Sequence, residues 1–167
     1  MVHRPIHVAV VCTGNICRSP MAEVALRHLI ADDDELRGAV MVTSAGTADW
    51  HVGSEMDPRA RSALNRAGLN LPGTPAAFAD RAYLNAHDVV VVMTREHRDD
   101  VRHRLTNEST DVVMARNLLE PGRDLDVADP YYGDDRAFDD CLELLRRAGQ
   151  RLTVALRQRL GASSFEV

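Results

Sequence analysis

Hydrophobic residues gather in four short runs along the chain, separated by longer stretches of mixed character. The runs cover residues 6–11, 40–43, 89–93 and 112–114 and are rich in valine and other apolar residues. Continuous apolar runs of this length are typical of strands that are buried on both faces, as in a parallel sheet. The pattern therefore predicts four buried strands.

The remaining stretches carry apolar residues at helical spacing and predict helices over residues 19–31, 57–67, 95–105 and 135–160. The last is expected to be a long closing helix, with a stripe of Phe138, Leu142, Leu145, Leu152 and Leu156. Strands that alternate with helices imply right-handed βαβ crossovers, so we expect a doubly wound α/β sheet flanked by helices. The length of 167 residues predicts one domain over residues 1–167.

Two pairs of residues mark expected helix starts. Ser19 before Pro20 is typical of an N-cap followed by proline at the first helical position, and Asp57 before Pro58 repeats the pattern. In an open α/β sheet, ligands bind beyond the carboxyl ends of the strands where the strand order reverses. The loop after the first strand is therefore the expected binding site.

That loop lies within the sequence VCTGNICRSP, residues 11–20. Its backbone N–H groups, with the positive end of the following helix dipole, can form a cradle for a tetrahedral oxyanion. Arg18 can grip two oxygens of that anion, and Gly14 and Asn15 tolerate the left-handed backbone conformations of such a loop. The expected phosphate-binding residues are Thr13, Gly14, Asn15, Ile16, Cys17, Arg18 and Ser19.

Cys12 is the expected nucleophile. A thiol at a helix N-terminus beside Arg18 favours the thiolate form, which a hydrogen bond from the Ser19 hydroxyl can stabilise further. A cysteine that merely ends a buried strand is the simpler interpretation of an isolated cysteine. The arginine, the small loop residues and the serine at one strand-to-helix junction favour the nucleophile.

Composition narrows the classes of function. The net charge of −5 predicts neither a nucleic-acid partner nor a membrane partner. The chain has no lysine, which excludes a Walker-type phosphate loop and Schiff-base chemistry. Three cysteines and an N-terminus too polar for a signal peptide predict a protein of the reducing cytoplasm.

The loop VCTGNICRSP resembles the phosphate-binding loop of the low-molecular-weight protein tyrosine phosphatases. The resemblance extends, in the family's order, to SAGTADWHVG (residues 44–53), MDPRA (residues 56–60) and VADPYYGD (residues 127–134). It implies a four-stranded sheet of order 2-1-3-4 and metal-independent hydrolysis of phosphotyrosine through a cysteinyl-phosphate on Cys12. The implied partner is a tyrosine-phosphorylated protein or peptide, the product is inorganic phosphate, and no cofactor is required.

A general acid must protonate the leaving group, and Asp129 in the stretch ADPYYG is expected to supply the proton. Pro130 restricts Asp129 to an extended conformation, and Gly133 suits a shaped loop. Taken alone, this stretch predicts only a turn. Together with the phosphate loop, the resemblance implies that Asp129 first acts as acid and then as base toward the hydrolytic water.

The resemblance also implies a substrate pocket formed by Thr47, Trp50, Tyr131 and Tyr132, with Trp50 at the rim. Relatives that act on phosphoarginine carry threonine at the position of Ile16, so Ile16 favours phosphotyrosine.

Cys17 is expected either to protect oxidised Cys12 by forming a reversible disulfide or to have only a structural role.

Two positions depart from the family pattern. Thr74 stands where a histidine commonly braces the loop asparagine, and Thr94 stands where an aspartate is expected. We expect these departures to affect the catalytic rate more than the type of reaction. Outside the pocket, Arg59 is expected to support its own loop or helix start, and Cys141 is expected to lie in the core.

Two other functions stay open. A thiol-linked arsenate reductase of the same fold needs further redox cysteines, for which the chain offers only Cys141. A non-catalytic phosphate-binding or redox-sensing module needs no turnover, although the set of Cys12, Arg18, Ser19 and Asp129 argues against it.

Overall fold

The structure is a computed structural model that describes residues 4–163. Four parallel strands form one sheet: β1 (Ile6–Cys12), β2 (Val40–Gly46), β3 (Val89–Val92) and β4 (Asp111–Met114). Their order is β2-β1-β3-β4. The predicted doubly wound sheet and its strand order are confirmed.

Within residues 4–163, five helices and two 3₁₀ turns lie between or after the strands. They are α1 (Arg18–Ala31), α2 (Pro58–Arg66), α3 (Arg81–Asn85), α4 (Arg95–Arg104), α5 (Asp135–Ser163), η1 (Ala115–Leu118) and η2 (Pro130–Tyr132). The four predicted helices are present within a few residues of the expected bounds, whereas the short helix α3 was not predicted. Among residues 4–163, no helix is both long and apolar enough to span a membrane.

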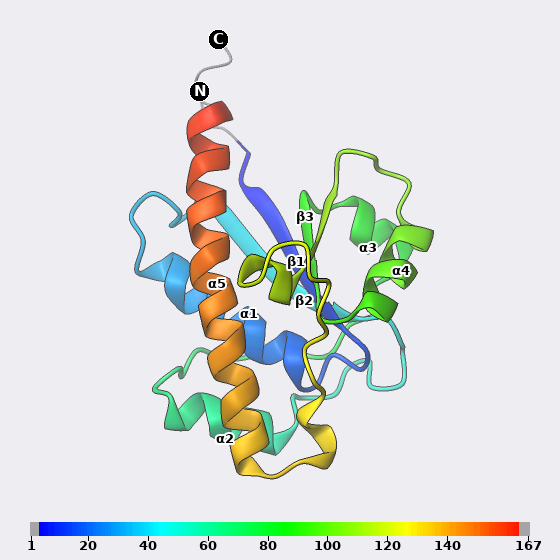
Figure 1. Cartoon of the computed structure of the whole chain (residues 1–167), viewed down its shortest axis with the longest axis vertical. Coiled ribbons are helices and arrows are strands. Elements are labelled where there is room, and N and C mark those ends of the chain that lie inside the picture. The colour runs from blue at the N-terminus through cyan, green and yellow to red at the C-terminus, as the bar shows by residue number, and fades with distance from the viewer. Residues whose placement is uncertain (1–3, 164–167) are drawn as a thin grey trace.

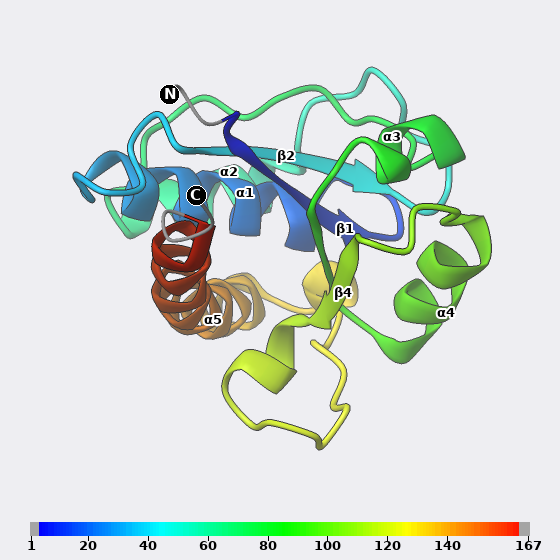
Figure 2. The same ribbon diagram turned by 90° about the horizontal axis from the view of Figure 1, so that it is seen from above.

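The central strands β1 and β3 bury both of their faces, as their continuous apolar sequences predict. The prediction is wrong for the edge strands β2 and β4, which leave residues such as Met41 and Asp111 exposed because each has a neighbouring strand on one side only. In β1, Val8 and Val10 join the cluster packed against α1, α2 and α5, and Ala9 and Val11 join the cluster on the side of α3 and α4. Figures 1 and 2 show α1, α2 and α5 on one side of the sheet and α3 and α4 on the other. Successive strand residues point to opposite faces, so a run without polar alternation is required.

Strand β2 extends three residues beyond the predicted end. Ser44, Ala45 and Gly46 continue the pairing with β1, and Gly46 lies opposite Cys12. A Cβ atom at Gly46 would lie 2.4 Å from the carbonyl oxygen of Thr13, so only glycine fits this approach. The end of β2 thereby packs directly against the loop that follows β1.

One of the two predicted helix starts is confirmed and the other is wrong. Asp57 is the N-cap of α2, and its side chain accepts a hydrogen bond from the backbone N–H of Arg59. Helix α1 begins at Arg18 instead, after Cys17 at the N-cap, and no side chain caps it. Ser19 lies inside this helix, and its hydroxyl contacts the loop rather than the helix amides.

Candidate active site

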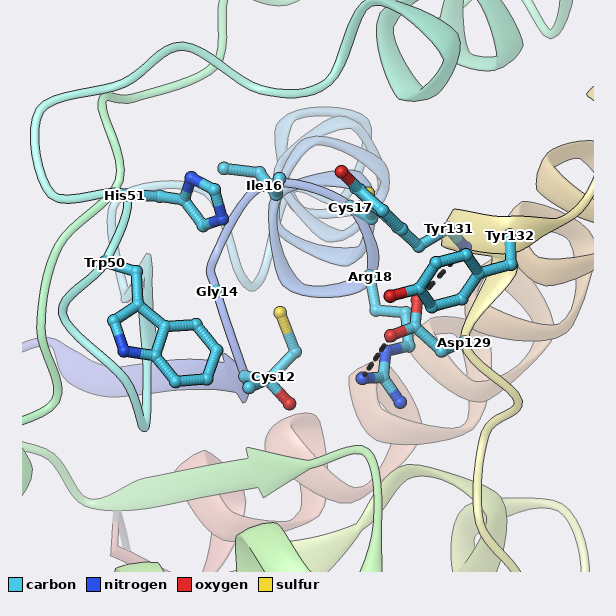
Figure 3. Close-up of a pocket in the computed structure, with 11 residues that line it drawn as sticks. Cys12, Gly14, Ile16, Cys17, Arg18, Trp50, His51, Asp129, Tyr131 and Tyr132 are labelled. Atoms are coloured by element: carbon cyan, nitrogen blue, oxygen red, sulfur yellow. Dashed lines mark hydrogen bonds and ion pairs between the residues drawn. The ribbon is translucent and has the colours of Figure 1, made fainter.

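A pocket of about 240 Å³ lies at the carboxyl end of β1 (Figure 3). The loop after β1 lines it with Cys12, Thr13, Gly14, Ile16, Cys17 and Arg18. The other lining residues are Trp50, His51, Asp129, Tyr131 and Tyr132. We call residues 12–18 the phosphate loop and residues 127–132 the acid segment. The strand order reverses at β1, where an open α/β sheet is expected to bind its ligand.

Cys12 is buried, with 3% of its surface exposed, and its sulfur points into the space that the loop encloses (Figure 3). The Sγ atom lies 3.0 Å from the Ser19 hydroxyl. Asn15 Nδ2 donates to that same hydroxyl oxygen at 2.7 Å, so the hydroxyl proton of Ser19 is free to donate to the sulfur. The N-terminus of α1 lies beside the loop and adds the positive end of its dipole.

Arg18 joins the phosphate loop to the acid segment. Its Nη1 donates to the carbonyl oxygen of Val127 at 3.0 Å, and its Nη2 donates to Asp129 Oδ2 at 3.3 Å. The Arg18 side chain is 6% exposed and that of Asp129 is 47% exposed. Asp129 is extended, as the following proline predicts, with φ −78° and ψ 117°. The structure thus brings together Cys12, Arg18 and Asp129.

Asn15 braces the phosphate loop from behind. Its φ is +58°, a left-handed conformation that asparagine tolerates. Its Oδ1 accepts from the backbone N–H of Ala77 at 2.9 Å, and its Nδ2 donates to Ser44 Oγ at 2.9 Å. Gly14 is not left-handed; a Cβ atom there would lie 2.9 Å from the His51 ring, so that side chain would have to move.

The bracing extends through Ser44 to a carboxylate in α1. Ser44 donates to Glu23 Oε2 at 2.6 Å, and Thr74 donates to the same oxygen at 3.1 Å. Thr74 therefore acts on Asn15 only through Glu23 and Ser44. The sequence did not single out Glu23, because a charged residue on a helix is usually exposed; this one is 1% exposed.

Thr94 does not contact the phosphate loop, because its hydroxyl oxygen caps α4 by accepting from the N–H of His97. The loop contact from this region comes from His97, whose Nε2 lies 2.7 Å from Thr13 Oγ1. Burial, and then the charge of Arg18, lower the pKa of His97 to about 4. Its buried Nδ1 has no partner, so a neutral ring with the proton on Nε2 leaves no N–H without an acceptor.

The rim of the pocket is aromatic and exposed. Trp50 is 76% exposed, Tyr131 41% and Tyr132 94%, which agrees with the rim position expected for Trp50. Thr47, expected in the pocket, is not among the lining residues. It is buried because its backbone N–H donates to the Cys12 carbonyl and continues the pairing of β1 with the segment after β2.

The family model for low molecular weight phosphotyrosine protein phosphatases matches residues 7–162. The chain belongs to this family. It is 39% identical over 158 residues to a low molecular weight protein-tyrosine-phosphatase of Streptomyces coelicolor, covering 92% of this chain and 94% of the relative. It is 42% identical over 150 residues to low molecular weight protein-tyrosine phosphatase A of Mycobacterium tuberculosis, covering 86% and 87%.

Solved structures of other proteins share the fold. YfkJ from Bacillus subtilis superposes with a TM-score of 0.82 at 28% identity and covers 94% of this chain and 98% of that one. The YwlE arginine phosphatase from Geobacillus stearothermophilus superposes with a TM-score of 0.77 at 28% identity and covers 97% of each chain. The fold alone therefore does not select between substrates.

The second cysteine of the phosphate loop differs from the first in its surroundings. Burial, and then the charge of Asp57, raise the pKa of Cys17 to about 12, so its thiol stays protonated at neutral pH. Cys12, Cys17 and Cys141 are all free thiols in the described structure. Cys141 is buried in α5, as expected.

Proposed function

We propose that this family member is a protein tyrosine phosphatase that uses Cys12 as nucleophile, Arg18 as phosphate ligand and Asp129 as general acid and base. One observation carries the proposal: a buried thiol, a buried guanidinium and a carboxylate share one small pocket. Arg18 and Asp129 lie 111 positions apart in the chain. Their meeting beside Cys12 is what the chemistry requires.

In the first step, the Cys12 thiolate attacks phosphorus, and the bond from phosphorus to the tyrosine oxygen breaks. Asp129 gives its proton to the departing phenolate, so tyrosine leaves in its neutral form. The Arg18 guanidinium and the backbone N–H groups of the loop bind the equatorial oxygens, where negative charge must be held in the transition state. The Ser19 hydroxyl stabilises the thiolate before attack.

In the second step, water attacks the phosphorus of the cysteinyl-phosphate. Asp129, now ionised, accepts a proton from this water, the bond from sulfur to phosphorus breaks, and inorganic phosphate leaves. We assign no metal ion or cofactor a role, because arginine, loop amides and a carboxylate supply each charge and proton that these steps need. A protective disulfide between Cys12 and Cys17 stays a prediction, and the high pKa of Cys17 argues for slow attack by its thiol.

Phosphotyrosine is the proposed substrate. Ile16 lines the pocket, and the aromatic rim of Trp50, Tyr131 and Tyr132 suits a phenyl ring. A phosphoarginine peptide is the competing substrate, since an arginine phosphatase has the same fold. Measuring the hydrolysis rates of a phosphotyrosine peptide and a phosphoarginine peptide at equal concentration distinguishes the two substrates, and we expect the phosphotyrosine peptide to be hydrolysed faster. Ile16→Thr should shift the ratio of the two rates toward phosphoarginine.

Turnover of an aryl phosphate in the presence of a chelator tests the reaction itself. We expect steady hydrolysis that vanadate blocks and that Cys12→Ser abolishes. The matched control is Cys141→Ser, which removes a buried thiol outside the pocket and should retain turnover. A Cys12→Ser variant that keeps its turnover would contradict the mechanism, and phosphopeptide binding without turnover would indicate a non-catalytic module.

The role of Asp129 has its own test. Asp129→Ala should lower kcat/KM for phenyl phosphate by roughly 10²–10⁴-fold, the usual contribution of general acid catalysis. Asp134→Ala, which removes a carboxylate from the same stretch beyond the pocket lining, is the control. Unchanged rates for Asp129→Ala would remove Asp129 from its role.

No observation favours an arsenate reductase, because the only further cysteine, Cys141, is buried in α5 rather than placed in the pocket.

The single domain expected over residues 1–167 also stays a prediction. It is supported, for residues 4–163, by helices that pack on both faces of one sheet.

A further inference from the structure

Arg59 lies outside the pocket lining, yet it contacts the acid segment directly. It lies in the first turn of α2, where its Nε and Nη2 donate to the two oxygens of Asp57 at 3.0 and 2.8 Å. Its remaining nitrogen, Nη1, donates to the carbonyl oxygen of Tyr131 at 2.7 Å. The sequence predicted only that Arg59 supports its own loop or helix start, so the contact with Tyr131 is additional.

The rings around Arg59 hold its guanidinium in place. Its Cζ lies 4.7 Å from the centroid of the Phe138 ring and 5.1 Å from that of the Tyr131 ring. Phe138 is fully buried in α5. A guanidinium over aromatic rings and in a two-pronged ion pair has little freedom, so Arg59 presents Nη1 to the acid segment from a fixed position.

The contact between Arg59 and Tyr131 can affect Asp129 because Tyr131 and Asp129 are joined by a hydrogen bond. The backbone N–H of Tyr131 donates to Asp129 Oδ1 at 3.2 Å. The Asp129 side chain is 47% exposed, so packing does not hold it in place. Its position depends on the backbone of the acid segment and on Arg18.

Asp57, the ion-pair partner of Arg59, contacts the phosphate loop. The backbone N–H of Asp57 donates to the carbonyl oxygen of Ile16 at 2.8 Å. Asp57 is also the ion-pair partner of Arg59, so the N-terminus of α2 is bonded both to the loop that binds phosphate and to the segment that carries the acid. The separation of the two segments is set by one short, stiff element.

We propose that Arg59 is a positioning residue that holds the carboxylate of Asp129 at the distance from the phosphate loop that proton transfer to the leaving group requires. This inference rests on the proposed function. Arg59 does not touch the substrate; it acts through Tyr131. Its loss should therefore weaken acid catalysis and leave attack by Cys12 unchanged.

The dependence of the rate on the leaving group separates these two effects. Phenyl phosphate needs its phenolate protonated as it leaves, whereas 2,4-dinitrophenyl phosphate releases a stable anion and needs no acid. The parameter to measure is kcat/KM, which covers the steps up to cleavage of the bond to the leaving group. Arg59→Met keeps an unbranched apolar side chain over Phe138 and removes the guanidinium.

For Arg59→Met we expect kcat/KM to fall about 10–100-fold on phenyl phosphate, the scale of a small displacement of a catalytic group, and less than about 3-fold on the dinitrophenyl ester. Asp129→Ala should show the same selectivity. In the Asp129→Ala background, Arg59→Met should cause no further selective loss, because the group that it positions is already absent. Arg59→Lys keeps the positive charge but cannot form the two-pronged ion pair. Its loss of kcat/KM on phenyl phosphate should lie between those of the unmodified protein and Arg59→Met.

Arg66→Met is the matched control. Arg66 lies on the same helix and forms an ion pair with Asp139 of α5 at 2.7 Å; its two ion-pair partners, Asp135 and Asp139, lie in α5 and not in the acid segment. The substitution should leave the ratio of kcat/KM on phenyl phosphate to kcat/KM on 2,4-dinitrophenyl phosphate unchanged. Equal losses on both substrates for Arg59→Met would overturn the inference and indicate a purely structural role.

Failure of the inference and failure of the proposed function give different results. If Asp129→Ala shows the selective loss and Arg59→Met does not, only the inference fails. If Asp129→Ala itself shows no selectivity, the assignment of the acid fails first. If Arg59→Met does not fold, as judged by circular dichroism and thermal unfolding, Arg59→Lys decides the question with the same ratio.

Discussion

The phosphate loop and the acid segment line the same pocket but are held in place by different means. The phosphate loop is braced from inside the protein, through Asn15, Ser44, Glu23 and His97, which are all at most 4% exposed. The acid segment is largely exposed, and Tyr132 is 94% exposed. Arginines from α1 and α2 hold it instead.

The two regions differ in this way because one binds the anion and the other transfers a proton to the leaving group. A loop that must present several N–H groups to one anion needs fixed geometry, and buried hydrogen bonds supply it because they do not exchange with water. An acid must reach a leaving group that enters and leaves, so its segment lies at the surface. Apart from the buried Val127 and Pro130, its position then depends on a few strong contacts with arginines.

The largest expected effect on stability comes from Asn15→Ala. The substitution removes the hydrogen bonds of Asn15 to the buried Ser44 and the half-buried Ala77 and places alanine at φ +58°. The free energy of unfolding should fall by about 2–4 kcal/mol and kcat/KM by about 10–100-fold. Urea unfolding and steady-state kinetics measure the two quantities.

Asn65→Ala is the control for that experiment, because Asn65 is exposed on α2. It should change neither quantity appreciably. If Asn15→Ala were as stable and as active as Asn65→Ala, the phosphate loop would not depend on its buried bracing, and the contrast with the acid segment would not hold.

A smaller, pH-dependent effect is expected from His97, whose pKa is lowered from 6.5 to about 4 by burial and then by Arg18, against the opposing charges of Asp126 and Asp129. Between these pH values the unfolded chain binds a proton at His97 that the folded chain does not. The unfolding free energy therefore decreases as the pH falls through this window, by roughly 2–3 kcal/mol from pH 7 to pH 4.5.

His97→Gln removes this titration and keeps an N–H donor for Thr13. Its unfolding free energy should depend less on pH over that range than that of the unmodified protein, as urea unfolding at several pH values would show. His103→Gln, which removes an exposed histidine from the same helix, should keep the original dependence. Parallel pH profiles for the protein and His97→Gln would contradict the assignment.

The smallest effect on stability is expected from Tyr132→Ala in the acid segment. Because Tyr132 is almost fully exposed and makes one edge contact with Tyr131, the unfolding free energy should change by less than about 0.5 kcal/mol. KM for an aryl phosphate should rise by about 2–10-fold, the value of one aromatic contact. A loss of stability as large as that of Asn15→Ala would erase the contrast between the two regions.

The sequence alone determined the sheet, its alternation with helices and the identity of the phosphate loop. These features depend on local signals: strands buried on both faces need uninterrupted apolar runs, and an anion-binding loop needs its residues adjacent in the chain. The extended conformation of Asp129 followed in the same way from the proline after it. The N-cap role predicted for Ser19 was wrong, whereas its predicted contact with Cys12 is present, because a serine hydroxyl that contacts the loop does not cap the helix.

Only the tertiary structure decided which distant residues serve the loop. The contacts of Asn15 with Ser44, of Thr13 with His97 and of Arg59 with Tyr131 join positions 29, 84 and 72 residues apart. No periodicity or spacing encodes such pairs, because each arises from the packing of separate elements around the sheet. For the same reason Thr47 lies in the backbone pairing beyond β2 rather than in the pocket.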